Sequence, residues 1–162
     1  MLAPYDPDWP ARFAAARTEM LAACNELMLD VHHVGSTSGL VAKPIIDLMP
    51  VLRRYEDGLD CVKPMESLGY IYRSAQGIEG RHLFVRGEPR THNVHVFALD
   101  HPEVERHLIF RDYLRAHPEA RDGYAALKIA LAEKFGKDRR AYTEAKTPFC
   151  ERIDRLARAE RG

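Results

Sequence analysis

The hydrophobic pattern of the chain changes from short strand-like runs to helical spacing at about Pro102, and this change restricts the fold more than any other feature. Before Pro102, runs of β-branched and aromatic residues alternate with turn residues, which is typical of strands. After it, apolar residues recur every three or four positions, which is typical of helices. We therefore expect an α+β fold, with a mixed β-sheet, flanking helices and a helical C-terminal third.

Two helices are predicted among the strands. Asp8 and Pro10 are typical of a helix start, because aspartate can cap the first turn and proline fits there. The helical spacing then continues to about Met28. A second helix is predicted over residues 56–68, interrupted by Pro64. The predicted strands are residues 30–34, 45–52, 70–73, 81–86 and 92–98, with a hairpin turn at 87–90, and the predicted C-terminal helices are 103–116, 119–135 and 139–159.

Length and composition narrow the class of protein. A chain of 162 residues with 46% hydrophobic residues fits one domain, so we expect residues 1–162 to form a single domain. Its 24 basic and 24 acidic side chains cancel, which argues against broad nucleic-acid binding. No run approaches the roughly 20 apolar residues of a membrane span, and no signal-peptide pattern is visible. Three widely spaced cysteines are typical of reduced thiols, so we expect a cytoplasmic protein.

The charges are unevenly distributed along the chain. Residues 1–102 carry 10 basic and 13 acidic side chains, whereas residues 103–162 carry 14 and 11. Arginine outnumbers lysine 18 to 6, and its guanidinium binds phosphate or carboxylate through two parallel hydrogen bonds. The excess either reflects an Arg-rich genome or serves an anionic ligand. In the second case we expect local positive potential in the helical third, opposite the acidic sheet half.

The segment 33–47 holds the sharpest local pattern. A predicted strand ends in Gly35, followed by Ser36, Thr37 and Ser38. Small residues with free backbone N–H groups and hydroxyls suit a phosphate, although the same pattern also occurs in ordinary hydroxyl-capped turns. Asp47 lies in the next apolar run, where an unpaired carboxylate would be expensive to bury. It therefore needs a basic partner or a metal ion.

These motifs resemble those of the GrpB family, within the nucleotidyltransferase-like superfamily. The resemblance implies a nucleotidyltransferase-like fold in which Gly-Ser holds the phosphates of a nucleotide and strand carboxylates hold divalent metal ions. It extends over nearly the whole chain. The residues that carry it are His33-Val34-Gly35-Ser36-Thr37-Ser38, Lys43-Pro44-Ile45-Ile46-Asp47, Gly80-Arg81-His82-Leu83-Phe84, Arg90-Thr91-His92-Asn93-Val94-His95-Val96, Phe110-Arg111-Asp112-Tyr113-Leu114-Arg115, Tyr124 with Leu127-Lys128, and Tyr142 with Lys146 and Phe149.

One position departs from the carboxylate pattern that two-metal catalysis needs. Active relatives of the superfamily carry Asp-x-Asp on one strand, but Met49 follows Asp47 here. A thioether is a poor ligand for Mg²⁺, so one Zn²⁺ or Mn²⁺ with histidine ligands suits the sequence better than two Mg²⁺ ions. Asp47, His92 and His95 are the candidate metal ligands. In a regular strand the two histidines point to opposite faces, and a strand histidine is often only structural.

Basic residues suggest how an anion would be held. Arg81 and Arg90 bracket the predicted hairpin, and Lys43 precedes the Asp47 strand. In the helical third, Tyr124 lies one turn before Lys128, and Tyr142 lies one turn before Lys146. Each such lysine either extends to solvent or meets an anion. We take the two Tyr-Lys pairs as candidate parts of a basic wall.

Together these features predict a protein that binds a nucleotide or another phosphorylated small molecule, with nucleotidyl or phosphoryl transfer as the activity. The candidate catalytic residues are Asp47, His33 and His95, and the candidate cofactor is a divalent ion (Mg²⁺, Mn²⁺ or Zn²⁺). A rival hypothesis is a non-catalytic accessory module, because some GrpB-like domains are fused to dephospho-CoA kinase. A third is a metal-dependent hydrolase that uses the histidines between residues 82 and 117.

Overall fold

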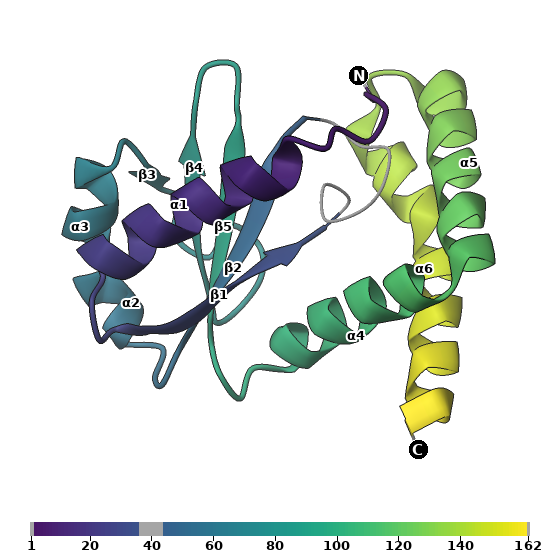
Figure 1. Cartoon of the computed structure of the whole chain (residues 1–162). Coiled ribbons are helices and arrows are strands. Elements are labelled where there is room, and N and C mark those ends of the chain that lie inside the picture. The colour runs from purple at the N-terminus through teal and green to yellow at the C-terminus, as the bar shows by residue number, and fades with distance from the viewer. Residues whose placement is uncertain (1, 36–43, 162) are drawn as a thin grey trace.

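A mixed β-sheet with helices on both faces forms the body of the protein, and further helices lie beside it (Figure 1). The computed structural model describes residues 2–35 and 44–161. Within these residues the helices are α1 (Trp9–Ala23), α2 (Asp57–Asp60), α3 (Val62–Ser67), α4 (Pro102–Ala116), α5 (Pro118–Phe135) and α6 (Arg139–Arg161). The strands are β1 (Met28–Val34), β2 (Ile46–Leu52), β3 (Ile71–Tyr72), β4 (Arg81–Arg86) and β5 (His92–Ala98).

The strand order is β1-β2-β5-β4-β3, and only the central pair of described strands, β2 and β5, runs parallel. Asp47 lies near the start of β2, opposite Val34 on β1 and Asn93 on β5. Because side chains alternate along a strand, residues 47, 49 and 51 share one face of β2, and residues 46 and 48 share the other. The sheet is therefore mixed, as the sequence predicted.

The two faces of the sheet are covered by different elements. Trp9 and Met20 of α1 pack with Ile46 and Leu48 on one face. Val104 of α4 packs with Met49 on the opposite face, in a smaller apolar cluster. Asp47 belongs to the face that α4 covers, because it is in phase with Met49.

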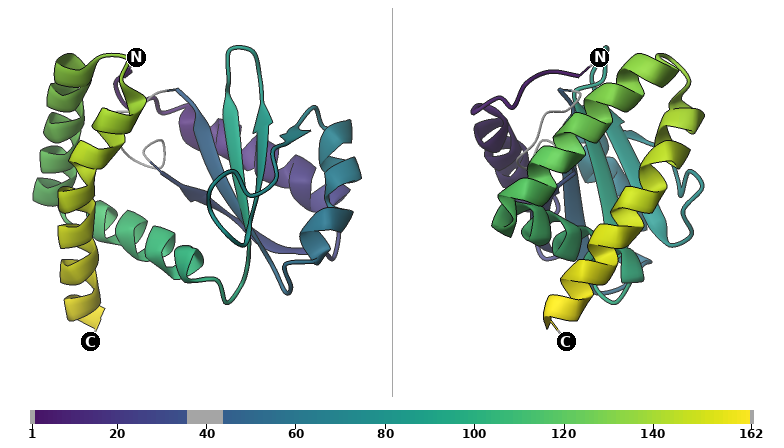
Figure 2. Two further views of the ribbon diagram at one scale, coloured as in Figure 1. Left: turned by 180° about the vertical axis from the view of Figure 1, so that it is seen from behind. Right: turned by 90° about the vertical axis from the view of Figure 1, so that its right-hand side faces the viewer.

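The helices α4, α5 and α6 pack against one another through an apolar cluster of their own. Leu114, Tyr124 and Ile153 are buried there, one from each helix. Figure 2 shows α5 and α6 side by side, with α4 reaching from them to the sheet. The predicted C-terminal helices agree with the observed bounds to within two residues.

Three details of the prediction for the N-terminal half are wrong. Helix α1 ends at Ala23, and Met28 begins β1, because Glu26 adopts a left-handed backbone with φ of 65° that turns the chain. The second predicted helix is broken at Cys61 and not at Pro64, which lies in the first turn of α3, where a missing N–H is tolerated. The side chain of Asp8 makes no capping hydrogen bond.

Candidate functional site

Asp47 packs directly against the backbone of Gly35, at the point where β1 ends. Gly35 has a φ of +70°, and a Cβ atom at this position would lie 2.7 Å from Oδ2 of Asp47. Real Cβ atoms essentially never approach that closely. Both this close approach and the left-handed backbone therefore require glycine at position 35. Gly35 and Asp47, which belong to the same sequence motif, are therefore in contact in the structure.

Asp47 has a second neighbour on the same face of the sheet. Nε2 of His95 lies 3.1 Å from Oδ1 of Asp47, and Nη1 of Arg81 lies 3.3 Å from Nδ1 of the same imidazole. His95 is in phase with Phe97 on β5 and thus faces α4. The three side chains form a row across β2, β5 and β4.

His92 lies away from this row. It is three residues from His95 and faces the other side of the sheet, where its ring meets Tyr70 edge-on and Nε2 lies 3.4 Å from Nη2 of Arg86. Burial lowers the pKa of His92 to about 4, and the nearby arginine acts in the same direction. The sheet therefore separates His92 from Asp47, and the structure does not bring these two candidate ligands together.

His33 is held inside the protein on the face of the sheet that α1 covers, so its side chain lies on the opposite face from Asp47 and the structure does not bring these two candidate catalytic residues together. Its ring stacks on Phe13 with centroids 4.6 Å apart and only 7% of the residue exposed. Its carbonyl oxygen accepts a hydrogen bond from Nη1 of Arg111 at 3.3 Å. Burial lowers the pKa of the imidazole to about 4, with smaller contributions from Arg115 and Arg111. His33 is therefore uncharged at neutral pH.

The burial of His33 predicts acid sensitivity. Between pH 6.5 and 4 the unfolded chain binds a proton at residue 33 that the folded chain does not, so the free energy of unfolding falls as pH falls. The loss at residue 33 is roughly 2–3 kcal/mol across this window. Urea unfolding at several pH values measures it. The free energy of unfolding should depend less steeply on pH in His33→Gln than in the unaltered chain. An unchanged pH dependence in this variant would contradict the lowered pKa of His33.

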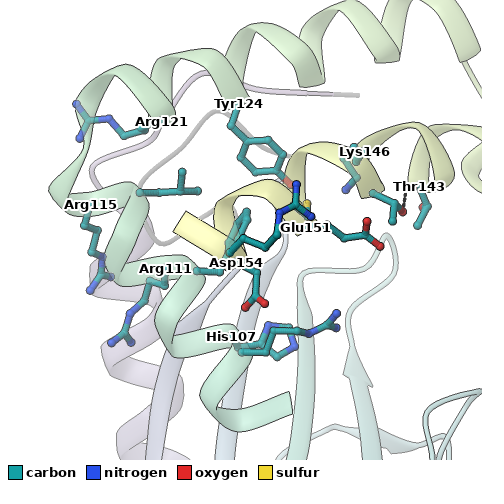
Figure 3. A pocket seen from close by; sticks show the side chains of 16 residues that line it. His107, Arg111, Arg115, Arg121, Tyr124, Thr143, Lys146, Glu151 and Asp154 are labelled. Carbon is teal, nitrogen blue, oxygen red and sulfur yellow. Dashed lines mark hydrogen bonds between the residues drawn. The ribbon is translucent and has the colours of Figure 1, made fainter. Parts of the chain in front are cut away.

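A cavity of about 540 Å³ lies between α4, α5, α6 and the end of β1. Figure 3 shows Arg111 and Arg115 on α4, with Lys146, Glu151 and Asp154 on α6. Six cationic side chains and two carboxylates line it, a formal balance of +4 on a chain whose charges sum to zero. Two of these cations, Arg106 and Arg111, also pair with carboxylates outside the lining, Glu103 and Asp112. The cationic residues are Arg106, Arg111, Arg115, Arg121, Lys146 and Arg155.

The cavity reaches the row of polar side chains on the sheet through two lining residues. Gly35 lines the cavity and contacts Asp47. His107 also lines it, and its ring centroid is 6.3 Å from that of His95. Nε2 of His107 lies 3.4 Å from Glu103, whose pKa is lowered to about 2, chiefly by the hydrogen bond from this histidine. The polar row thus adjoins the cavity.

The basic residues singled out in the sequence take different positions. Lys146 lines the cavity, with Nζ 4.8 Å from the ring of Tyr142. Lys128 is 3% exposed, and its Nζ lies 5.4 Å from the ring of Tyr124. Arg81 lies behind His95, and Arg90 is exposed in the hairpin turn. Four other candidates, Ser36, Thr37, Ser38 and Lys43, lie outside the described residues.

Sequence reasoning gave no role to most of the cavity residues. On α4 these are residues 106, 107, 110, 111, 114 and 115, which recur in adjacent pairs one turn apart. This spacing places them on one face of a helix. The stripe is visible in the sequence as three adjacent pairs one turn apart, each of which contains an arginine, and part of it belongs to a motif that carries the resemblance. That pattern was the available signal.

The described side chains do not fit the predicted metal site. Across residues 2–35 and 44–161, no three His, Cys, Asp or Glu side chains are grouped so that they could hold a metal ion. Met49, at the position of a second carboxylate, is fully buried in an apolar cluster. His92 is on the far side of the sheet. The described side chains alone therefore do not provide a metal site.

Among the helices in the described part of the chain, none is long and apolar enough to cross a membrane.

Sequence comparison identifies relatives over most of the chain. Residues 1–155 match the family described as GrpB protein. A UPF0157 protein of Pseudomonas aeruginosa is 41% identical over 157 residues, which cover 93% of this chain and 64% of that protein. The UPF0157 protein YqkA of Bacillus subtilis is 34% identical over 157 residues, which cover 95% of this chain and 46% of that protein. This chain therefore spans less than two thirds of the length of both relatives.

Structural comparison gives a near and a distant likeness. The crystal structure of conserved protein GrpB from Enterococcus faecalis has a TM-score of 0.90 and 34% identity, covering 97% of this chain and 96% of that chain. Cid1 in complex with the UTP analog UMPNPP has a TM-score of 0.55 and 13% identity, and the likeness covers 82% of this chain and 41% of the Cid1 chain. These likenesses confirm the predicted α+β, nucleotidyltransferase-like fold. A dephospho-CoA kinase of Mycolicibacterium paratuberculosis is also similar, with 28% identity over 91% of this chain and 43% of that protein.

Proposed function

The chain belongs to the GrpB family, as its motifs predicted, and we propose that it binds a nucleotide or another phosphorylated small molecule in the cavity between α4, α5 and α6. The observation that carries this proposal is the cationic lining of a cavity in a protein with no net charge. Arginine is well matched to phosphate, because its planar guanidinium donates two parallel hydrogen bonds. The volume of about 540 Å³ lies within the range of pockets that bind small molecules.

The arginines of α4 support an anionic ligand for a further reason. Burial lowers the pKa of Arg115, and the positive charge of Arg111 one turn away lowers it further. Asp112 pairs with Arg111 at 2.9 Å and offsets part of this repulsion, and an anion bound between the two guanidinium groups would offset the rest. A phosphate at this end of the cavity would also lie near Gly35, which lines it.

A nucleotide is favoured among phosphorylated compounds by the likeness of this fold to Cid1, which was solved with a UTP analog. In our proposal the phosphates lie toward Arg111, Arg115 and Gly35, and Lys146 on α6 contributes further positive charge. Nucleotidyl or phosphoryl transfer is the activity that such binding would serve. Asp47 and His95 are then the acid–base pair nearest to the ligand.

A thermal-shift screen tests this proposal. The compounds are nucleoside mono-, di- and triphosphates, sugar phosphates and phosphorylated coenzyme precursors. A specific ligand at a hundred times its Kd should stabilise the protein by about 2.7 kcal/mol, a rise in Tm of roughly 5–11 °C. The corresponding unphosphorylated compounds are the control. If no phosphorylated compound shifts Tm more than its unphosphorylated partner, the proposal fails.

Cys150 offers an independent measure of cavity occupancy. Its side chain lines the cavity, whereas Cys24 and Cys61 are buried in the core. Alkylation of the folded protein by iodoacetamide should therefore occur first at Cys150. A ligand in the cavity should slow this alkylation, as measured by mass spectrometry of the intact chain. A ligand that raises Tm without protecting Cys150 binds elsewhere.

A second candidate function is an accessory role, which the similarity to mycobacterial dephospho-CoA kinases favours. In this case the chain would assist the folding or assembly of a kinase domain. The test is the refolding yield of a separately expressed dephospho-CoA kinase with and without this chain. A higher yield together with no ligand in the thermal-shift screen would favour the accessory role over ligand binding.

A further inference from the structure

The guanidinium of Arg81 is fixed in place beside His95. Arg81 is 8% exposed, and its Nε and Nη2 atoms donate to the carbonyl oxygens of Ala75 and Gln76 at 3.1 and 2.9 Å. Nη1 is then left facing Nδ1 of His95 at 3.3 Å. The guanidinium cannot rotate away from His95 without losing two hydrogen bonds to the backbone.

This contact determines which nitrogen of His95 carries the proton. A guanidinium group only donates hydrogen bonds, so Nδ1 must present its lone pair to Arg81. The neutral ring then carries its proton on Nε2, which faces Oδ1 of Asp47 at 3.1 Å. The resulting chain of hydrogen bonds runs from Arg81 through His95 to Asp47.

We propose that this chain of three side chains places a proton between His95 and Asp47, where the resemblance to nucleotidyltransferases implies a metal ion, and that Arg81 is the positioning residue that keeps it there. A divalent ion at Asp47 and His95 needs a lone pair on Nε2, which this tautomer does not offer. It also needs free carboxylate oxygens, but Oδ1 accepts from His95 and Oδ2 packs against Gly35. Met49 supplies no second carboxylate.

The proposal concerns the sheet side of the site and holds whether or not the cavity binds phosphate. Its failure is therefore separate from that of the proposed function. Asp47 and His95 would contact a ligand through hydrogen bonds. Arginine and lysine side chains would neutralise the negative charge of the ligand directly. Added divalent ions should then be unnecessary for anion binding.

The first test is the tautomer of His95, measured by long-range ¹H–¹⁵N NMR correlation on the ¹⁵N-labelled chain without ligand. We expect the pattern of a proton on Nε2 alone. Arg81→Met removes the donor and should mix the two tautomers, whereas Arg81→Lys keeps a donor and should restore the Nε2–H form. A proton on Nδ1 in the unaltered chain would overturn the proposal.

The second test does not depend on whether an Arg81 variant folds. Mn²⁺ is added in excess to the unaltered chain, and the broadening of backbone amide signals is recorded. The amides of Gly35, Asp47 and His95 should broaden no more than those of exposed acidic residues such as Glu144. Selective broadening at these three amides that disappears in Asp47→Asn would show a metal site and overturn the proposal.

Discussion

Replacing Arg111 and Arg115 together by glutamine is expected to weaken binding of a phosphorylated ligand at least about 100-fold. Each hydrogen bond from a charged donor contributes roughly 1.5–3 kcal/mol, and a tenfold change in Kd corresponds to about 1.4 kcal/mol. Both residues line the cavity, so both guanidinium groups are available to donate hydrogen bonds to an anion bound there. Isothermal titration calorimetry with the ligand found in the screen measures the change.

The control for this prediction must remove the same charge without touching the cavity. Arg140 and Arg161 on α6 are exposed and do not line it, so the double variant Arg140→Gln/Arg161→Gln should bind with nearly unchanged affinity. Far-ultraviolet circular dichroism verifies that the Arg111 variant is folded, because Arg111 also donates to the carbonyl of His33. Equal weakening in both double variants would indicate long-range attraction in place of a defined site.

Gly35→Ala is expected to destabilise the protein by about 3 kcal/mol, a fall in Tm of roughly 6–12 °C. Part of the loss arises because alanine disfavours the left-handed backbone that Gly35 adopts. The rest arises because the added Cβ would lie 2.7 Å from Oδ2 and 3.1 Å from Cγ of Asp47. The carboxylate must move, so His95 should lose its hydrogen-bond partner as well. Thermal unfolding and the NMR spectrum of His95 measure these effects.

Gly123 provides the matched control for Gly35. It lies inside α5, and a Cβ atom there would meet nothing within 4 Å. Gly123→Ala should therefore stabilise the protein by roughly 0.5–1 kcal/mol, as alanine does in a helix. A comparable loss of stability in both variants would contradict the assigned contact between Gly35 and Asp47.

The fold could be predicted from the sequence because its signals are local. The helical spacing after Pro102 and the turn at residues 87–90 each depend on residues close in the chain. The boundary errors occurred where local spacing was ambiguous. Cys24 and Met28 are four positions apart, which is the spacing of residues one turn apart on a helix. In the structure Cys24 follows the end of α1 and Met28 begins β1, and both pack in the same core.

The candidate site could be predicted only where one motif held the relevant residues. Gly35 and Asp47 were both singled out because they belong to one motif, and the opposite orientation of His92 and His95 followed from strand alternation. The cavity could not be predicted in this way, because its residues Arg111, Arg121 and Arg155 come from three helices. No local pattern specifies how these helices are rotated relative to one another. Likewise, nothing in the sequence showed that the donors of Arg81 are used by Ala75, Gln76 and His95.

The parallel pairing of β2 with β5 has a consequence for the order in which the protein folds. These central strands are joined by the segment that contains α2, α3, β3 and β4, so the middle of the sheet closes only after this segment has been made. Closing such a loop is entropically unfavourable and slows folding. On the ribosome, all strands of the described sheet are available once Ala98 has emerged. The cationic helices follow, so the cavity is assembled on a sheet that can already have formed.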